Sequence, residues 1–90
     1  MTESRVDMIR ERLDHELSPS ELEVIDDSHL HRGHPGARDG RGHFRVRIVS
    51  DHFRDQSRLA RHRLVYAAMG ELMNTDIHAL NIEAISDNEV

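Results

Sequence analysis

The sequence predicts an α+β domain in which two helices pack on one face of a three-stranded mixed sheet. The chain has 90 residues, which suits one small hydrophobic core and one domain over residues 1–90. Apolar residues recur with helical spacing in two stretches and alternate with polar residues in three others. The predicted order is helix, strand, strand, helix, strand, which favours helices on one face of a sheet.

The first predicted element is an amphipathic helix over residues 4–17. Ser4 and Asp7 form a loose capping box at its start, and the helix ends before Pro19. Its apolar residues are spaced three, four and four apart, at Val6, Ile9, Leu13 and Leu17.

Two half-buried strands are expected next, over residues 21–25 and 44–48. Polar and apolar residues alternate briefly in the first strand and strictly in the second. Arg45 and Arg47 should therefore share the outer face of the sheet. The connection from Ser28 to Gly42 is rich in glycine and histidine and is too long for a tight hairpin turn.

A second helix is predicted over residues 57–73. Its apolar stripe is spaced three, four, three and four, at Leu59, His62, Tyr66, Met69 and Met73. His62 falls in the middle of the apolar half, which favours a partly buried structural histidine over a functional one. Arg61 and Arg63 project toward the rim and the polar face, where a guanidinium can contact a phosphate or an acidic residue of a partner.

A turn is predicted at residues 74–76, followed by a last strand over residues 77–85. Alternation along this strand places four residues on a shared face, namely His78, Leu80, Ile82 and Ala84. His78 should then lie at the end of the sheet, half packed and half reachable.

The composition excludes several kinds of chemistry. The chain has no cysteine, so it can form no disulfide, no four-thiolate zinc site and no cluster held by its own thiolates. The longest apolar run, residues 64–69, is far shorter than the roughly 20 residues that cross a bilayer. The first residues lack the features of a signal or transit peptide, and we expect a cytoplasmic protein without a membrane partner.

Charge is divided along the chain. Acidic residues dominate residues 1–27 and 64–90, whereas residues 28–63 hold nine arginines, three aspartates and six of the eight histidines. This middle segment could form a basic patch that faces nucleic acid or an acidic protein. The alternative is that the arginines form an ordinary solvated face.

The string Arg61-His62-Arg63-Leu64-Val65-Tyr66, followed by Ile77-His78-Ala79-Leu80, resembles the signature of the BolA family. The front half resembles the family too, from Leu22-Glu23-Val24 and Asp26-Asp27-Ser28 to His43-Phe44-Arg45-Val46. The Arg-His-Arg form is more similar to BolA proper than to the divergent sister group. The last five residues lack the tryptophan that is common there.

This resemblance implies a fold similar to class II KH domains, a monothiol glutaredoxin partner and a [2Fe-2S] cluster shared with it. In the family, the histidine that corresponds to His78 resembles an iron ligand. His31 lies three residues after Ser28, where the family's loop ligand is usually found. His29 and His34 lie close by, and the sequence leaves open whether one of them replaces His31 or whether the loop is simply solvated.

Two functions from different classes follow. The first is an interaction module in iron–sulfur cluster handling or iron regulation, which depends on His78 and the loop histidine. The second is a DNA-binding transcriptional regulator of stress response and morphology, which depends on phosphate contacts of five arginines, Arg45, Arg47, Arg58, Arg61 and Arg63. We expect no enzymatic activity and no small-molecule substrate, because no nucleophile with an activating base and no cofactor fingerprint occurs in the sequence.

Overall fold

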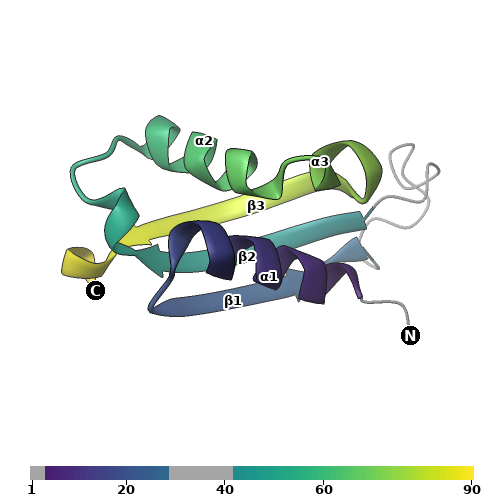
Figure 1. Ribbon diagram of the computed structural model, residues 1–90, viewed down its shortest axis with the longest axis horizontal. Coiled ribbons are helices and arrows are strands. Elements are labelled where there is room, and N and C mark those ends of the chain that lie inside the picture. The colour runs from purple at the N-terminus through teal and green to yellow at the C-terminus, as the bar shows by residue number, and fades with distance from the viewer. Residues whose placement is uncertain (1–3, 29–41) are drawn as a thin grey trace.

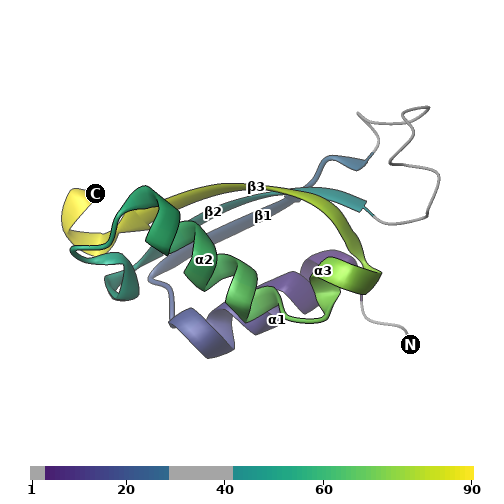
Figure 2. The same cartoon turned by 90° about the horizontal axis from the view of Figure 1, so that it is seen from above.

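Three strands form one mixed sheet, and the helices lie together on one of its faces (Figure 1 and Figure 2). A computed structural model of the chain describes residues 4–28 and 42–90. In chain order the elements are α1 (Arg5–Leu17), β1 (Glu21–Asp26), β2 (Gly42–Ser50), the 3-10 helix η3 (Asp51–Phe53), α2 (Arg58–Met69), α3 (Leu72–Thr75), β3 (Ile77–Ser86) and the 3-10 helix η4 (Asp87–Glu89). The predicted α+β class is confirmed.

The order of strands in the sheet is β1-β2-β3, with β1 antiparallel and β3 parallel to the central strand β2. A parallel connection needs a crossover, and α2 and α3 supply it between β2 and β3. Figure 2 shows this crossover on the same side of the sheet as α1. β1 and β3 are therefore the two edge strands of the described sheet. No helix or strand of residues 4–28 and 42–90 covers the face away from the helices, which is called the bare face here.

Helix α1 agrees with its prediction to within one residue. The Ser4 hydroxyl accepts a hydrogen bond from the Asp7 backbone N–H at 3.1 Å, which caps the start of the helix. Ser18 follows the helix in the left-handed region, with φ at 42°. The apolar stripe faces the sheet with three fully buried side chains, Ile9, Leu13 and Leu17.

The second predicted helix is interrupted at Gly70. Its backbone, with φ 55° and ψ −127°, ends α2 at Met69, and the short helix α3 begins at Leu72. The expectation of one helix over 57–73 was therefore wrong, because a glycine in this conformation breaks the helical hydrogen bonding. The expected turn at residues 74–76 was wrong as well, since Asn74 and Thr75 belong to α3.

The buried stripe of α2 is narrower than its sequence suggests. Leu59 and Tyr66 are 60% and 42% exposed, whereas Val65 and Met69 are fully buried. Helix α2 lies over the edge strand β3 (Figure 1), and no further strand of the described residues lies beneath its outer flank. An apolar stripe on a wheel predicts burial only where a neighbouring element is present to cover it.

The core lies between the helices and the inner face of the sheet. Phe44 and Phe53 are 2% and 0% exposed. The other buried members of this core come from all the main elements except β1: Ile9, Leu13, Leu17, Val46, Ile48, Val65, Ala68, Met69, Leu72, Ile77 and Ile82. β1 contributes the half-buried Leu22 and Val24.

Strand β3 begins with a shift in register. Gly42 pairs with Ile77, but its neighbour His43 pairs with Ala79, so His78 is an extra residue between two paired positions of β3. Such a bulge displaces the alternation of side chains by one residue. The prediction that His78 shares a face with Leu80 was therefore wrong, because simple alternation does not cross the bulge.

Candidate functional site

Two histidines lie side by side where β2 and β3 begin. The ring centroids of His43 and His78 are 5.1 Å apart, and the planes of the rings are tilted by 49°. His78 is exposed and His43 is half-buried. His43 alternates with the buried Phe44 and so belongs to the bare face of the sheet, and the bulge brings His78 to it.

Hydrogen bonds fix the backbone around this pair. The His43 N–H donates to the Ser28 hydroxyl at 3.0 Å, and the Asp27 N–H donates to the His43 carbonyl at 2.8 Å. On the other side, the Gly42 N–H donates to the Asp76 carbonyl at 2.8 Å. The end of β1, the start of β2 and the turn before β3 are thereby joined.

Gly42 is required by close packing at this point. A Cβ atom here would lie 2.6 Å from the Phe44 ring and 2.8 Å from the Ser28 hydroxyl oxygen. Real Cβ atoms do not come so near to a ring without displacing it, so the chain passes here only without a side chain. The glycine is visible in the sequence, but the contacts with Phe44 and Ser28 that require it are made only in the fold.

The loop histidines predicted as ligands, His31 with His29 and His34 beside it, lie outside the described residues. The two anchor points of their connection are described, however. Ser28 and Gly42 both lie next to His43, through the hydrogen bond of Ser28 and through sequence adjacency. The connection therefore leaves and re-enters the sheet beside the two-histidine pair.

Arg45 and Arg47 lie on the bare face of the sheet, as predicted. Arg45 donates from Nε and Nη2 to one carboxylate oxygen of Asp27, at 3.1 and 2.9 Å. Arg47 is paired with Glu21 of β1 at 3.5 Å. Their role in binding a partner stays a prediction, and both guanidinium groups already have an acidic neighbour within the chain.

Arg61 is more enclosed than the rim position expected for it, because its side chain is only 14% exposed. Its Nη1 and Nη2 atoms donate to the two carboxylate oxygens of Glu89 at 2.7 and 3.1 Å. The same guanidinium also donates to the Ala84 carbonyl at 3.2 Å and the Gln56 carbonyl at 2.9 Å. These contacts tie α2 to the C-terminal end of the chain. Arg63, two residues on, is exposed.

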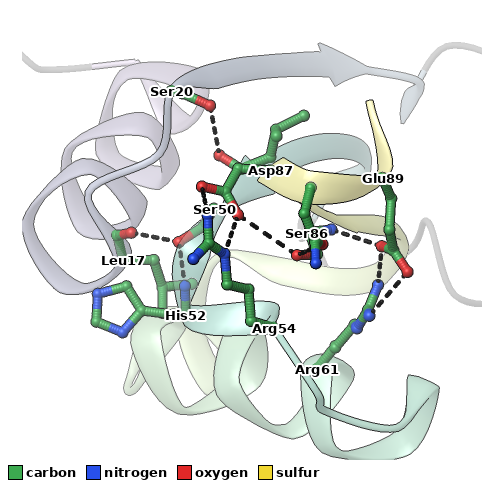
Figure 3. A network of polar contacts seen from close by, with 11 residues as sticks. Leu17, Ser20, Ser50, His52, Arg54, Arg61, Ser86, Asp87 and Glu89 are labelled. Carbon is green, nitrogen blue, oxygen red and sulfur yellow. Dashed lines mark hydrogen bonds and ion pairs between the residues drawn. The ribbon is translucent and has the colours of Figure 1, made fainter.

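A second ion pair lies in the same region. Arg54 donates from Nε to Asp87 at 2.7 Å and from Nη2 at 3.0 Å (Figure 3). The hydrogen bond from Arg54 lowers the pKa of the Asp87 carboxyl, and the hydrogen bond from Arg61 lowers the pKa of the Glu89 carboxyl. Both carboxyl groups are thus held in their charged form, which keeps η4 attached to the domain.

These ion pairs bear on the basic patch that was predicted from the distribution of charge along the sequence. Among the described part of the middle segment, four arginines are paired with acidic residues of the two flanking segments: Arg45, Arg47, Arg54 and Arg61. Arg58 and Arg63 of α2 are exposed and occur in none of these pairs. In the described residues, the predicted basic patch is therefore largely neutralised within the fold.

A groove of about 750 Å³ is lined by residues of α2, β2 and β3. Arg58 and His62 of α2 line it together with His43 and Asp27 at the β2 side. His62 is half-buried, which agrees with the partly buried position predicted for it. His43 was not predicted as a site residue, although it lies in a strand that begins at the end of a histidine-rich connection.

No group of three or more histidine, aspartate or glutamate side chains is close enough to hold a metal ion within residues 4–28 and 42–90. Any metal centre built on His78 therefore needs further ligands. Across the same residues, no helix is long and apolar enough to cross a membrane.

Known proteins bear out the resemblance noted in the sequence. A family model described as BolA-like protein matches residues 13–89. This chain belongs to the BolA-like family. The BolA domain of SufE1 from Arabidopsis thaliana has a similar structure, with a TM-score of 0.86, 43% sequence identity and full coverage of both chains.

Three curated relatives illustrate the range of the family. The chain is 46% identical to SufE-like protein 1, chloroplastic/mitochondrial, of Arabidopsis thaliana and 41% identical to its Protein BOLA1, chloroplastic, covering 97% of this chain in both alignments. It spans only 25% and 56% of those two proteins. It is 37% identical to the DNA-binding transcriptional regulator BolA of Escherichia coli (strain K12), covering 91% of this chain and 79% of that protein.

Proposed function

We propose that this BolA-like chain is a non-enzymatic interaction module that binds a monothiol glutaredoxin and shares a [2Fe-2S] cluster with it. Its place would be in the handling of iron–sulfur clusters or in iron regulation, in the cytoplasm. The observation that carries the proposal is the position of His78, an exposed imidazole in a bulge at the start of an edge strand.

The position of His78 suits a residue that ligates a cluster held between two proteins. A bulge can re-aim a side chain, and bulges are frequent next to functional sites. Within residues 4–28 and 42–90, no strand pairs with the outer edge of β3, and the exposed side of the His78 ring can be reached from solvent by a partner. The bonded backbone of Gly42 and His43 beside it gives the ligand a firm support.

The residues present fit one side of such a cluster. A neutral imidazole replaces a thiolate in some [2Fe-2S] centres and raises their potential. The chain has no cysteine, so the thiolates must come from the partner. His31 would be this chain's second ligand, with His29 or His34 as its alternatives, because Ser28 and Gly42 place the ends of that connection beside His43 and His78.

Co-expression with a monothiol glutaredoxin tests the proposal. The expected result is a brown heterodimer that elutes together in gel filtration and contains about one [2Fe-2S] cluster per pair. Two proteins that elute separately, or a pair without colour, would overturn it.

The alternative function is a DNA-binding transcriptional regulator, favoured by the name of the E. coli relative. Phosphate contacts would fall to Arg58 and Arg63, because the other described arginines of the middle segment are held by carboxylates. A gel-shift series at two salt concentrations distinguishes the two functions. DNA binding that persists at physiological salt and is lost in Arg58→Ala/Arg63→Ala would support the alternative, and binding seen only at low salt would count against it.

A further inference from the structure

The 3-10 helix η4 adds charge to the domain but no side chain to its core. None of its three residues is buried, and Val90 after it is 71% exposed. Arg54 binds Asp87 and Arg61 binds Glu89, each through two hydrogen bonds (Figure 3). Because these contacts are polar and lie outside the core, η4 can leave its place without exposing buried apolar side chains.

The carboxylates of η4 balance the charge of the segment that carries these arginines. Residues 51–63 hold four arginines and two aspartates. Asp87 and Glu89 supply two further negative charges from η4. Detachment of η4 would therefore leave residues 51–63 with an excess of two positive charges.

A second groove, of about 370 Å³, is lined by residues of α2 and β3 and reaches Arg61. Arg58 and His62 line it as well, together with residues 82–84 of β3. Glu89 binds the two terminal nitrogens of Arg61 with its two carboxylate oxygens. Arginine binds phosphate in the same two-point manner. Glu89 thus holds the position in which Arg61 would meet a phosphate.

We propose that η4 is an internal mimic of a nucleic-acid backbone, which occupies Arg54 and Arg61 in the free chain and is displaced when duplex DNA binds. The displacement rests on the alternative function, in which Arg58 and Arg63 contact DNA. These two arginines would make the first phosphate contacts, and Arg54 and Arg61 would then exchange a carboxylate for a phosphate. Since each exchange breaks an ion pair, η4 lowers the affinity of the chain for DNA.

Duplex DNA suits this displacement better than an acidic protein does. A carboxylate from a separate protein competes with an equivalent group that is already attached to the chain and so has a high effective concentration. Duplex DNA carries about one negative charge per 1.7 Å, and it releases condensed counterions when arginines bind its phosphates. It can therefore displace a tethered carboxylate that a single free carboxylate cannot.

Fluorescence anisotropy with a labelled duplex measures the effect of η4 on affinity. Asp87→Asn/Glu89→Gln should bind the duplex about three- to tenfold more tightly than the unaltered chain, because it no longer has to break two exposed ion pairs. The matched control is Glu11→Gln/Asp14→Asn, which removes the same two charges from exposed positions of α1 and should bind like the unaltered chain. Circular dichroism checks that each variant is folded.

Two further measurements follow the exchange itself. In the Asp87→Asn/Glu89→Gln background, Arg54→Ala should lower the affinity again, because the released guanidinium is then missing. Arg54 is preferred to Arg61 for this purpose, since Arg61 also holds two backbone carbonyls. In the unaltered chain, the Ser86 N–H donates to Glu89 at 2.8 Å. Added duplex should therefore shift the Ser86 amide resonance in NMR toward its position in Glu89→Ala, whereas polyglutamate should not.

Equal affinities of the unaltered chain and Asp87→Asn/Glu89→Gln would overturn the role of η4 and leave DNA binding itself standing. An equal gain in Glu11→Gln/Asp14→Asn would overturn it too, because any lost negative charge would then have the same effect. A Ser86 resonance that moves with polyglutamate but not with the duplex would overturn it in favour of an acidic protein partner. No duplex binding by any of these proteins would instead refute the alternative function, and the role of η4 with it.

Discussion

Arg61 and Glu89 form a two-point ion pair, Nη1 to Oε1 at 2.7 Å and Nη2 to Oε2 at 3.1 Å. The pair joins the first residue of the family motif on α2 to the 3-10 helix at the end of the chain. Glu89 also accepts from the Ser86 N–H at 2.8 Å, so it links η4 to the end of β3 as well. The arginine that the motif suggests as a contact for a partner is thus engaged in holding the C-terminal segment.

Replacing Arg61 by alanine should lower the melting temperature. Glu89 would lose its charge partner, and two backbone carbonyls, of Ala84 and Gln56, would lose a donor. Arg63→Ala is the matched control, because it removes the same charge from an exposed position of the same helix. Thermal unfolding followed by circular dichroism makes the comparison. Equal melting temperatures for the two variants would contradict the structural role of Arg61.

Acid should release the C-terminal segment. The pKa values of Asp87 and Glu89 are lowered by Arg54 and Arg61, so these groups stabilise the fold above the unfolded-state pKa, about 4. That contribution is lost as the pH falls from about 4 through the lower folded-state values. In melts from pH 7 to pH 2, Asp87→Asn and Glu89→Gln should each lose less stability over this acidic range than the unaltered chain. An identical acid response in all three proteins would disprove the effect.

Gly70 should be needed for the break between α2 and α3. Its φ of 55° with ψ of −127° lies in a region that residues with a side chain avoid. Gly70→Ala should therefore cost about 1–3 kcal/mol of the free energy of unfolding. Urea unfolding measures this cost, with Ala67→Gly as the comparison, where an exposed helical position should lose about 1 kcal/mol through helix propensity alone. A more stable Gly70→Ala variant would show that the helix can continue through this point.

Helix α1, the start of α2, the three strands and the class of fold were predictable because each follows a hydrophobic period, whereas the break at Gly70 and the separate helix α3 were not predicted. The position of His78 was not, because a one-residue bulge shifts the alternation and depends on pairing between two distant strands. The helical spacing also did not predict that Leu59 and Tyr66 are exposed. A helical wheel reports which residues share a side, but it does not report how far the neighbouring sheet extends.

The divided charge shows another limit of the sequence. A basic middle segment between acidic ends suggested a patch for an anionic partner. In the fold, Glu21 of β1 pairs with Arg47 of β2, and Asp27, which directly follows β1, pairs with Arg45. The C-terminal residues Asp87 and Glu89 pair with Arg54 and Arg61. Oppositely charged segments of one chain can pair with each other instead of with an anionic partner, and the topology of the fold decides which pairs form.

Any binding of DNA should depend on the two exposed arginines of α2. Arg58→Ala/Arg63→Ala should weaken an observed complex uniformly across DNA sequences and reduce its dependence on salt. His78→Ala should leave that complex unchanged, because one exposed imidazole contributes little to phosphate binding. Fluorescence anisotropy with a labelled duplex at several salt concentrations gives both quantities. A strong loss of DNA binding in His78→Ala would contradict this division of roles.

The role of His78 in a shared cluster is tested most directly by visible absorption and circular dichroism of the glutaredoxin heterocomplex. The unaltered chain, His78→Ala and the distant control His52→Ala are each co-purified with the same monothiol glutaredoxin. The account predicts that His78→Ala changes the spectrum and makes the cluster more labile, while His52→Ala matches the unaltered complex. A His78→Ala complex with an unchanged spectrum and unchanged cluster stability would show that His78 is not a ligand.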